Sequence, residues 1–415
     1  MQARPSTWSI AALVWPFGLA YALSYALRTI NAVLSPAFVE ELGLSAGALG
    51  LLTSAYLVAF AAMQLPVGLL LDRYGPRRVE GSLLLLAWLG CMLSALAESF
   101  WLLWLGRALI GMGVSACLMA SYKAYRLALP VSLQAPLAST MLVIGSFGAL
   151  CATLPVEWAL GWLSWREIFW LLSVCFGLAW AAIVFGLPSV PAPEQPTARL
   201  WADARAGLVT VMTHPEFRRL MPFGLITYGG LLAMHGLWMG PWFRVVEGQS
   251  PADAALGIFI ITATVMGSHL LTAWLASRVA DWGWSLEGLM RMGLLAMASM
   301  SALAVLGAWP HPWLGWMLVF LAGGTTTLSY TRFAQSFPDQ LSGRATTSFN
   351  FLIFLGAFLV QWGVGLLIDG FEAWGLLGPQ AMRAGVGVWV LGQVAALLWL
   401  IRRAEPPEDR AHAAG

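Results

Sequence analysis

Apolar stretches of about 20 residues recur along the whole chain, and they constrain the fold more than any other feature. A helix of that length crosses about 30 Å of hydrocarbon. The stretches are continuously apolar rather than alternating, which is typical of helices and not of barrel strands. Only 10% of the residues are charged, whereas a soluble domain carries about 25%. We therefore predict an all-α membrane protein with twelve transmembrane helices, at 9–36, 48–71, 79–98, 100–121, 133–156, 167–187, 219–243, 255–279, 289–308, 312–334, 346–369 and 382–401.

The placement of positive charge predicts how these helices are oriented. Alternate loops hold Arg73, Arg77, Arg78, Lys123, Arg126, Arg278, Arg291 and Arg344, whereas the opposite loops hold Arg166, Arg244 and Arg383. An even number of crossings puts both termini on one side, and the positive-inside rule makes that side cytoplasmic. We expect a multi-pass protein of a bacterial cytoplasmic (inner) membrane, surrounded by membrane lipid.

A segment rich in proline and charge, 187–216, separates six spans from six. The expected parts are an N-terminal six-helix bundle at 1–188, a cytoplasmic linker at 189–218, a C-terminal six-helix bundle at 219–403 and a disordered cytoplasmic tail at 404–415. The halves echo each other: GLLLDRYGPRR at 68–78 and LASRVADWGW at 275–284 follow equivalent spans, and each places an acid shortly before an aromatic–glycine pair. Such a pseudo-symmetric repeat is typical of transporters.

The loop after the second span also carries a family likeness. Motif A of the major facilitator superfamily is matched by Gly68, Asp72, Arg73, Gly75, Arg77 and Arg78. The fourth span adds Arg107, Gly111 and Gly113, which are similar to motif B. The chain thus resembles a bacterial member of that superfamily over its whole length, with no subfamily or substrate indicated.

The resemblance implies two bundles that rock about a central cavity lined by spans 1, 4, 7 and 10. It also implies a role for Arg107 in substrate binding or coupling, and a cytoplasmic latch formed by Asp72, Arg73, Gly75, Arg77 and Arg78. Arg77 and Arg78 are equally explained as positive-inside anchors. The fifth span lacks the Gly-Pro pair of the family's antiporters, which disfavours a drug/proton antiporter.

A polar stripe runs through the first span, at Tyr21, Ser24, Arg28, Asn31 and Ser35. Its spacings of 3, 4, 3 and 4 place these side chains on one helical face. An arginine at the centre of a membrane costs about 3 kcal/mol unless water, a partner or a ligand solvates it. We therefore expect a wet, ligand-sized hollow here, in which Tyr21, Arg28 and Asn31 bind substrate. The alternative is that Arg28 bonds a carbonyl or Glu157 inside the bundle.

The fourth and fifth spans supply the remaining charges of the first half. Arg107 and Lys123 are candidates for the substrate site, although Lys123 can instead snorkel to the lipid headgroups. Glu157 is the main acid that we assign to these spans, near the external face. We expect it to pair with Arg107 or Arg166. The other interpretation is that Glu157 titrates as a coupling proton site, because desolvation raises the pKa of a carboxyl.

In the second half, the candidate substrate residues are Tyr228, His235, Trp238, Tyr330, Asn350 and Gln361. Tyr228, His235 and Trp242 are spaced by 7 and so share a face of the seventh span. His235 can carry a proton or donate to an anion near neutral pH, or it can simply be a packing residue. The polar groups of spans 10 and 11 can bind uncharged parts of a substrate or join helices.

The charge balance of the spans predicts the kind of substrate. Arg28, Arg107 and Lys123 outnumber the acids assigned to the spans, and a surplus of fixed positive charge attracts anions. We predict a secondary active transporter, proton-coupled and monomeric, for an anionic or zwitterionic solute: an organic acid, an amino acid-like compound or a peptide. The alternatives are a proton-driven efflux pump for hydrophobic compounds and a non-transporting membrane sensor. No H-E-x-x-H, G-x-S-x-G or Walker A motif occurs, so we expect neither an enzyme nor direct use of ATP, and no cofactor, metal or nucleic-acid partner.

Overall fold

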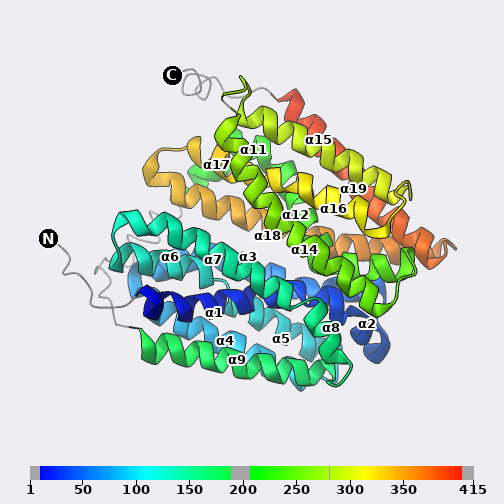
Figure 1. Ribbon diagram of the computed structural model, residues 1–415, viewed down its shortest axis with the longest axis horizontal. Coiled ribbons are helices and arrows are strands. Elements are labelled where there is room, and N and C mark those ends of the chain that lie inside the picture. The colour runs from blue at the N-terminus through cyan, green and yellow to red at the C-terminus, as the bar shows by residue number, and fades with distance from the viewer. Residues whose placement is uncertain (1–9, 188–205, 280, 404–415) are drawn as a thin grey trace. The chain divides into compact units, whose positions relative to one another are not determined.

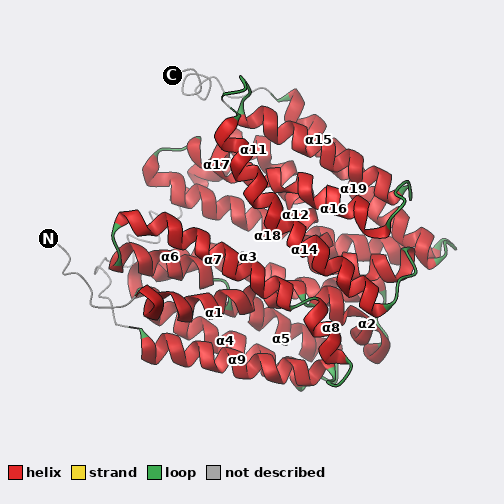
Figure 2. Cartoon of the chain, in the orientation of Figure 1, coloured by secondary structure: helices red, strands yellow, loops and turns green. Residues whose placement is uncertain are grey.

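The computed structural model describes residues 10–187, 206–279 and 281–403, and within these ranges the chain is helical with no strand (Figures 1 and 2). Eleven of the described helical segments are long and apolar enough to cross a membrane. The expected span 312–334 is interrupted, because a 3₁₀ turn, η4 (Gly324–Thr327), separates α16 (Pro312–Gly323) from α17 (Leu328–Gln335). The prediction of an all-α membrane protein is confirmed. The expected tail, 404–415, and most of the expected linker lie outside the described residues.

The chain divides into two compact units, and the first comprises 1–42 and 55–201. Its described helices are α1 (Ile10–Thr29), α2 (Asn31–Leu42), the greater part of α3 (Ala46–Tyr74), α4 (Pro76–Ala95), α5 (Phe100–Gly113), α6 (Cys117–Ala128), α7 (Val131–Cys151), α8 (Leu154–Leu160) and α9 (Trp165–Gly186). Helix α4 packs against α5 and α9, and α1 packs against α7. Glycines permit these close crossings: a Cβ at Gly113 would lie 2.3 Å from Ala87 N, and one at Gly148 would lie 2.1 Å from Ala22 O.

Two expected spans of this unit are broken. The helix predicted at 9–36 is divided at Ile30, and the one at 100–121 is divided between Gly113 and Cys117. The first break leaves the carbonyl of Leu27 at the end of α1, where the guanidinium of Arg107 donates to it from Nη2 at 3.0 Å. A tertiary contact thus takes the place of the next helical hydrogen bond. The polar stripe of the first span is therefore shared between α1 and α2.

The second unit comprises 43–54 and 202–415. Its long described helices are α14 (Pro251–Arg278), α15 (Leu286–Val305), α18 (Asp339–Ala373) and α19 (Gly378–Arg402). The span 215–246 begins with α11 (Pro215–Pro222) and continues through π-helical turns η1 (Phe223–Tyr228), η2 (Met234–Trp238) and η3 (Trp242–Val246), separated by α12 (Gly229–Ala233) and α13 (Met239–Pro241). Pro222 and Pro241 directly precede η1 and η3. Because proline has no N–H, it removes an i→i−4 bond and allows the wider turn.

The first turns of α3 belong to this second unit and pack tightly on α18. A Cβ at Gly50 would lie 2.7 Å from Gln361 O, and one at Gly365 would lie 2.4 Å from Ala46 O. Asp369 accepts hydrogen bonds from Ser45 Oγ at 2.7 Å and Gly47 N at 2.9 Å. The Asp369 carboxylate of α18 therefore caps the N-terminus of α3, where the helix dipole favours a negative charge.

Candidate functional site

Arg28 lies among aromatic side chains in the first unit. Its Cζ is 4.6 Å from the centroid of the Tyr25 ring and 5.4 Å from that of Phe60. The Tyr21 ring contacts Tyr25 edge-to-face, with centroids 4.9 Å apart. Arg28 is half-buried, whereas Tyr21 is buried. Aromatic faces stabilise a guanidinium by about 0.5–2 kcal/mol, so this surrounding holds the charge while leaving part of it exposed.

Arg107 is fully buried beside this aromatic cluster. Its Cζ is 5.9 Å from the Tyr56 ring centroid and equally far from that of Phe169. Apart from the bond to Leu27 O, its Nε and Nη1 have no hydrogen-bond partner among the described residues. Tyr56 Oη in turn donates to Ser24 O at 3.2 Å. Arg107 therefore contacts α1 directly at the Leu27 carbonyl, and the Tyr56 side chain lies between Arg107 and Ser24 on the polar face of α1.

The ion pair that the sequence led us to expect for Glu157 is wrong for both partners. Arg107 makes no ion pair in the described chain, and Arg166 pairs with Glu41 at 2.5 Å. The indole Nε1 of Trp165 also donates to Glu41, at 2.6 Å. Burial acts to raise the pKa of Glu41, but the hydrogen bonds from Trp165 and Arg166 outweigh it and lower the pKa. Glu157 itself lies half-buried in α8.

The latch residues show one unexpected pairing. Lys123 Nζ lies 2.6 Å from Asp72 Oδ1, so a residue that we assigned to the substrate site neutralises one that we assigned to the latch. Arg77 donates from Nε at 3.0 Å to the carbonyl of Val184, in α9. Gly75 has φ 77°, a left-handed conformation, directly before α4. Glycine is required there because a Cβ disfavours that conformation.

Arg73 and Arg78 are the two remaining arginines of the expected latch. Arg73 Cζ lies 4.9 Å from the ring centroid of Tyr74, and Arg78 is exposed. Asn31, which we expected to bind substrate, is buried at the start of α2, and its Oδ1 has no hydrogen-bond partner among the described residues.

Three of the second unit's candidates come together. Tyr330 Oη donates to Asn350 Oδ1 at 2.6 Å, and the rings of Tyr228 and Tyr330 meet edge-to-face with centroids 5.8 Å apart. They come from η1, α17 and α18. The other candidates make helix-to-helix bonds. His235 Nε2 is 3.0 Å from Thr262 Oγ1, and Trp238 Nε1 donates to Gln361 O at 3.1 Å.

These bonds favour the packing interpretation for His235, Trp238 and Gln361. Gln361 also donates from Nε2 to Thr53 Oγ1, at 2.8 Å. The predicted spacing of the seventh span is also altered, because η1 and η2 have more residues per turn than an α-helix. Tyr228, His235 and Trp242 therefore do not follow the spacing from which we inferred a common face.

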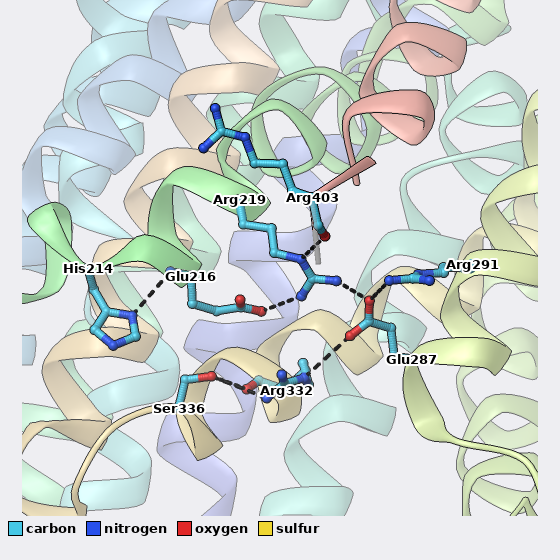
Figure 3. A network of polar contacts seen from close by, with 8 residues as sticks. All are labelled: His214, Glu216, Arg219, Glu287, Arg291, Arg332, Ser336 and Arg403. Atoms are coloured by element: carbon cyan, nitrogen blue, oxygen red, sulfur yellow. Dashed lines mark hydrogen bonds and ion pairs between the residues drawn. The ribbon is translucent and has the colours of Figure 1, made fainter. Parts of the chain in front are cut away.

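Sequence reasoning missed two charged features, an ion cluster and a single buried carboxyl. One is the ion cluster of Glu216, Arg219, Glu287, Arg291 and Arg332 (Figure 3). Arg219 Nη1 lies 2.9 Å from Glu216 Oε1, and Arg219 Nη2 contacts Glu287. Arg219 Nε donates to Arg403 O at 3.1 Å. Glu287 in turn contacts Arg291. The sequence spacings of Glu216 with Arg219 and of Glu287 with Arg291 could have predicted two of these ion pairs, since residues three or four apart are neighbours on a helix. The other is Glu80, which is fully buried in α4.

The comparisons with known proteins agree with this fold. The model of the family described as the Major Facilitator Superfamily matches residues 17–361. The solved structure of a D-xylose-proton symporter has a TM-score of 0.78 at 14% identity, covering 95% of this chain and 98% of that one. This likeness shows the shared fold.

Three relatives are similar in sequence. A "Probable sulfoacetate transporter" of Cupriavidus necator is 27% identical over 61% of this chain and 61% of its own length. A "Chloramphenicol resistance protein" of Pseudomonas aeruginosa is 28% identical over 66% and 63%. A "Hexuronate transporter" of Escherichia coli K12 is 30% identical over 42% and 40%. The matches thus span less than two thirds of these curated relatives.

Proposed function

The chain belongs to the Major Facilitator Superfamily, and from that premise we propose that it moves a small organic anion across a bacterial inner membrane by alternating access. Its relatives include transporters of sulfoacetate and of hexuronates, both of which are organic acid anions. A proton gradient is the proposed energy source, and both termini are proposed to be cytoplasmic. The linker at 189–218 is proposed to join two six-helix bundles.

The observation that carries the proposal is the pair of guanidinium groups in the first unit, those of Arg28 and Arg107. Arg107 is buried with no ion-pair partner in the described chain, so its positive charge acts on its surroundings unscreened. Arg28 is half-buried between Tyr25 and Phe60. A guanidinium binds a carboxylate or sulfonate through two parallel hydrogen bonds. We assign direct contact with the anion to Arg28 and a long-range attraction to Arg107.

Within the second unit, Tyr228, Tyr330 and Asn350 are proposed as a group that can bind uncharged parts of a solute. Tyr228, Tyr330 and Asn350 offer hydroxyl and amide groups around one contact, and such groups suit the hydroxyls of a sugar acid. Latch function remains our proposal for Asp72, Arg73, Gly75, Arg77 and Arg78. Lys123 is reassigned to that latch, because it pairs with Asp72.

A thermal-shift screen of the purified protein tests the substrate class. We expect sulfoacetate, galacturonate or a comparable organic acid to raise the melting temperature, and Arg28→Gln to abolish that rise. The matched control is Arg126→Gln, because Arg126 is an exposed arginine of the first unit that we assign neither to the substrate site nor to the latch. A rise with neutral sugars and none with any acid would remove the basis of the proposal.

A second candidate function is efflux of hydrophobic compounds. The chloramphenicol-resistance relative and the contacts of Tyr330 with Tyr228 and Phe349 favour it. The buried charge of Arg107 does not. Chloramphenicol in the same screen separates the two functions, and an acid that binds but is never carried into proteoliposomes would indicate a sensor.

A further inference from the structure

Glu80 is a membrane-buried carboxyl that the proposed function leaves unassigned. It lies in the second turn of α4, which begins at Pro76, and none of its surface is exposed. Neither carboxyl oxygen has a hydrogen-bond partner of normal geometry in the described chain. It escaped the sequence analysis because it lies at the edge of the span predicted at 79–98.

The neighbouring helices offer this carboxyl one titratable group. From α6, the thiol of Cys117 is close enough to interact with it, and a thiol is a weak hydrogen-bond donor. From α9, the side facing the adjacent Gly81 is apolar, with Val184 and Ile183. From α5, Arg107 makes no ion pair in the described chain. On α4 itself, Arg77 is turned to Val184 O.

Such surroundings do not support a permanent negative charge. An ionised carboxylate removed from water and from hydrogen-bond donors is strongly disfavoured. The N-terminal end of α4 attracts a negative charge only weakly by comparison. A bound proton removes this penalty, because the neutral acid has far less to lose on burial. The carboxyl therefore suits a role in which it takes up and releases a proton as its surroundings change.

Helix α6 packs against both the helix that carries Glu80 and the helix that carries Arg28. These are α4 and α1, respectively. Cys117 begins α6, directly after the break that separates α5 from α6. A shift of α6 would alter the surroundings of Glu80 and of Arg28 together. An anion bound at Arg28 would favour a proton at Glu80, and by linkage the proton would favour the anion.

We propose that Glu80 carries the proton that is transported with the anion, an inference that rests on the proposed function above. When the site is open to one side of the membrane, a hydronium ion gives its proton to a carboxylate oxygen of Glu80, which forms one O–H bond and leaves a water molecule. The O–H bond persists while the site is sealed, and it breaks when water from the other side reaches the carboxyl and accepts the proton. Transport of a monoanion with this proton is electroneutral, since one positive and one negative charge move together.

The first test reports on the proton without knowledge of the substrate. Infrared spectra of the full chain in lipid vesicles are recorded as the pH rises from neutral to alkaline. We expect the carbonyl band of a protonated carboxylic acid at neutral pH, present in the wild type and absent from Glu80→Gln. The matched control is Glu98→Gln, an exposed acid just beyond the other end of α4, which should keep the band. A wild type without the band overturns the proposal.

The second test measures coupling, with radiolabelled galacturonate as the probe in proteoliposomes. We expect Glu80→Gln to keep galacturonate exchange at no more than a twofold loss, and to lose accumulation driven by a pH gradient. Accumulation that survives in Glu80→Gln overturns the proposal. Loss of both exchange and accumulation in a folded variant also overturns it, because Glu80 would then serve the movement of cargo itself. A wild type that carries no organic acid refutes the proposed function instead, while the infrared band still decides whether Glu80 holds a proton.

Discussion

Replacement of Glu287 by glutamine is expected to destabilise the second unit strongly. The Glu287 side chain is only 5% exposed and contacts Arg219, Arg291 and Arg332 (Figure 3). Arg219 is 2% exposed, and its remaining acidic partner is Glu216. The variant removes the carboxylate that the guanidinium groups of Arg219, Arg291 and Arg332 share. The glutamine amide also turns N–H donors toward groups that can only donate.

The magnitude follows from the burial of each partner. Loss of one member of a buried ion pair costs about 3–5 kcal/mol, which applies to the contact with Arg219. The Arg291 side chain is 35% exposed, so water screens it and its contact is worth about 1 kcal/mol at most. We therefore expect Glu287→Gln to lower the free energy of unfolding by about 3 kcal/mol, roughly a hundredfold in the equilibrium constant. Arg291→Gln should lower it by less than about 1 kcal/mol.

Equilibrium unfolding in mixed detergent micelles, followed by tryptophan fluorescence, measures both values. Glu98→Gln serves as the control for loss of an exposed acid. A loss below about 0.5 kcal/mol for Glu287→Gln would refute the reasoning, because that is the ordinary effect of a surface substitution. Equal losses for Glu287→Gln and Arg291→Gln would also refute it, since burial would then not set the magnitude.

Three further predictions concern the first unit. Gly75→Ala should lower the free energy of unfolding by about 1–3 kcal/mol in the same unfolding assay, because residue 75 has φ 77° and ψ 164°, a backbone conformation that is strained for any residue with a Cβ. A double-mutant cycle of Lys123→Met and Asp72→Asn should give a coupling energy below about 1 kcal/mol, since the Asp72 side chain is 57% exposed. The pKa of Glu41 is lowered in the folded state. Its pair with Arg166 therefore contributes its full stabilisation at pH values above the pKa of Glu41 in the unfolded state. That stabilisation is lost as the pH falls through the lower pKa of the folded state. Arg166→Gln should therefore destabilise the protein more at neutral pH than in acid, where only its contacts with Ala97 O and Trp165 are lost, as melting temperatures over a pH series would show.

Hydropathy predicted the fold well, because each membrane span has to satisfy its own backbone and so appears as a local pattern. The breaks within spans were not predictable in this way. Ile30 is neither proline nor glycine, and the Leu27 carbonyl at the end of α1 accepts a hydrogen bond from Arg107, 80 residues away. The π-helical turns had a partial signal in Pro222 and Pro241, but their extent depends on contacts with other helices.

The candidate site was harder to predict than the fold. Motif A located Asp72, but its partner Lys123 lies 51 residues away, and no local spacing connects them. Glu157 was given the wrong partners because ion pairs between helices depend on how each helix is rotated, which composition does not report. Glu80 was missed because hydropathy places the boundary of a span only to within a few residues, and the helix begins before the apolar stretch does.

Uptake by reconstituted protein tests most directly the claim that the Arg28 guanidinium binds an organic anion in a wet part of the protein. Proteoliposomes carrying the wild type and folded Arg28→Gln are given radiolabelled galacturonate, sulfoacetate and chloramphenicol in turn. We predict that the wild type accumulates at least one of the two acids, and that Arg28→Gln reduces this uptake at least tenfold, about 1.4 kcal/mol of binding free energy. Uptake of an acid that is unchanged by Arg28→Gln, or transport of chloramphenicol alone, would contradict the account.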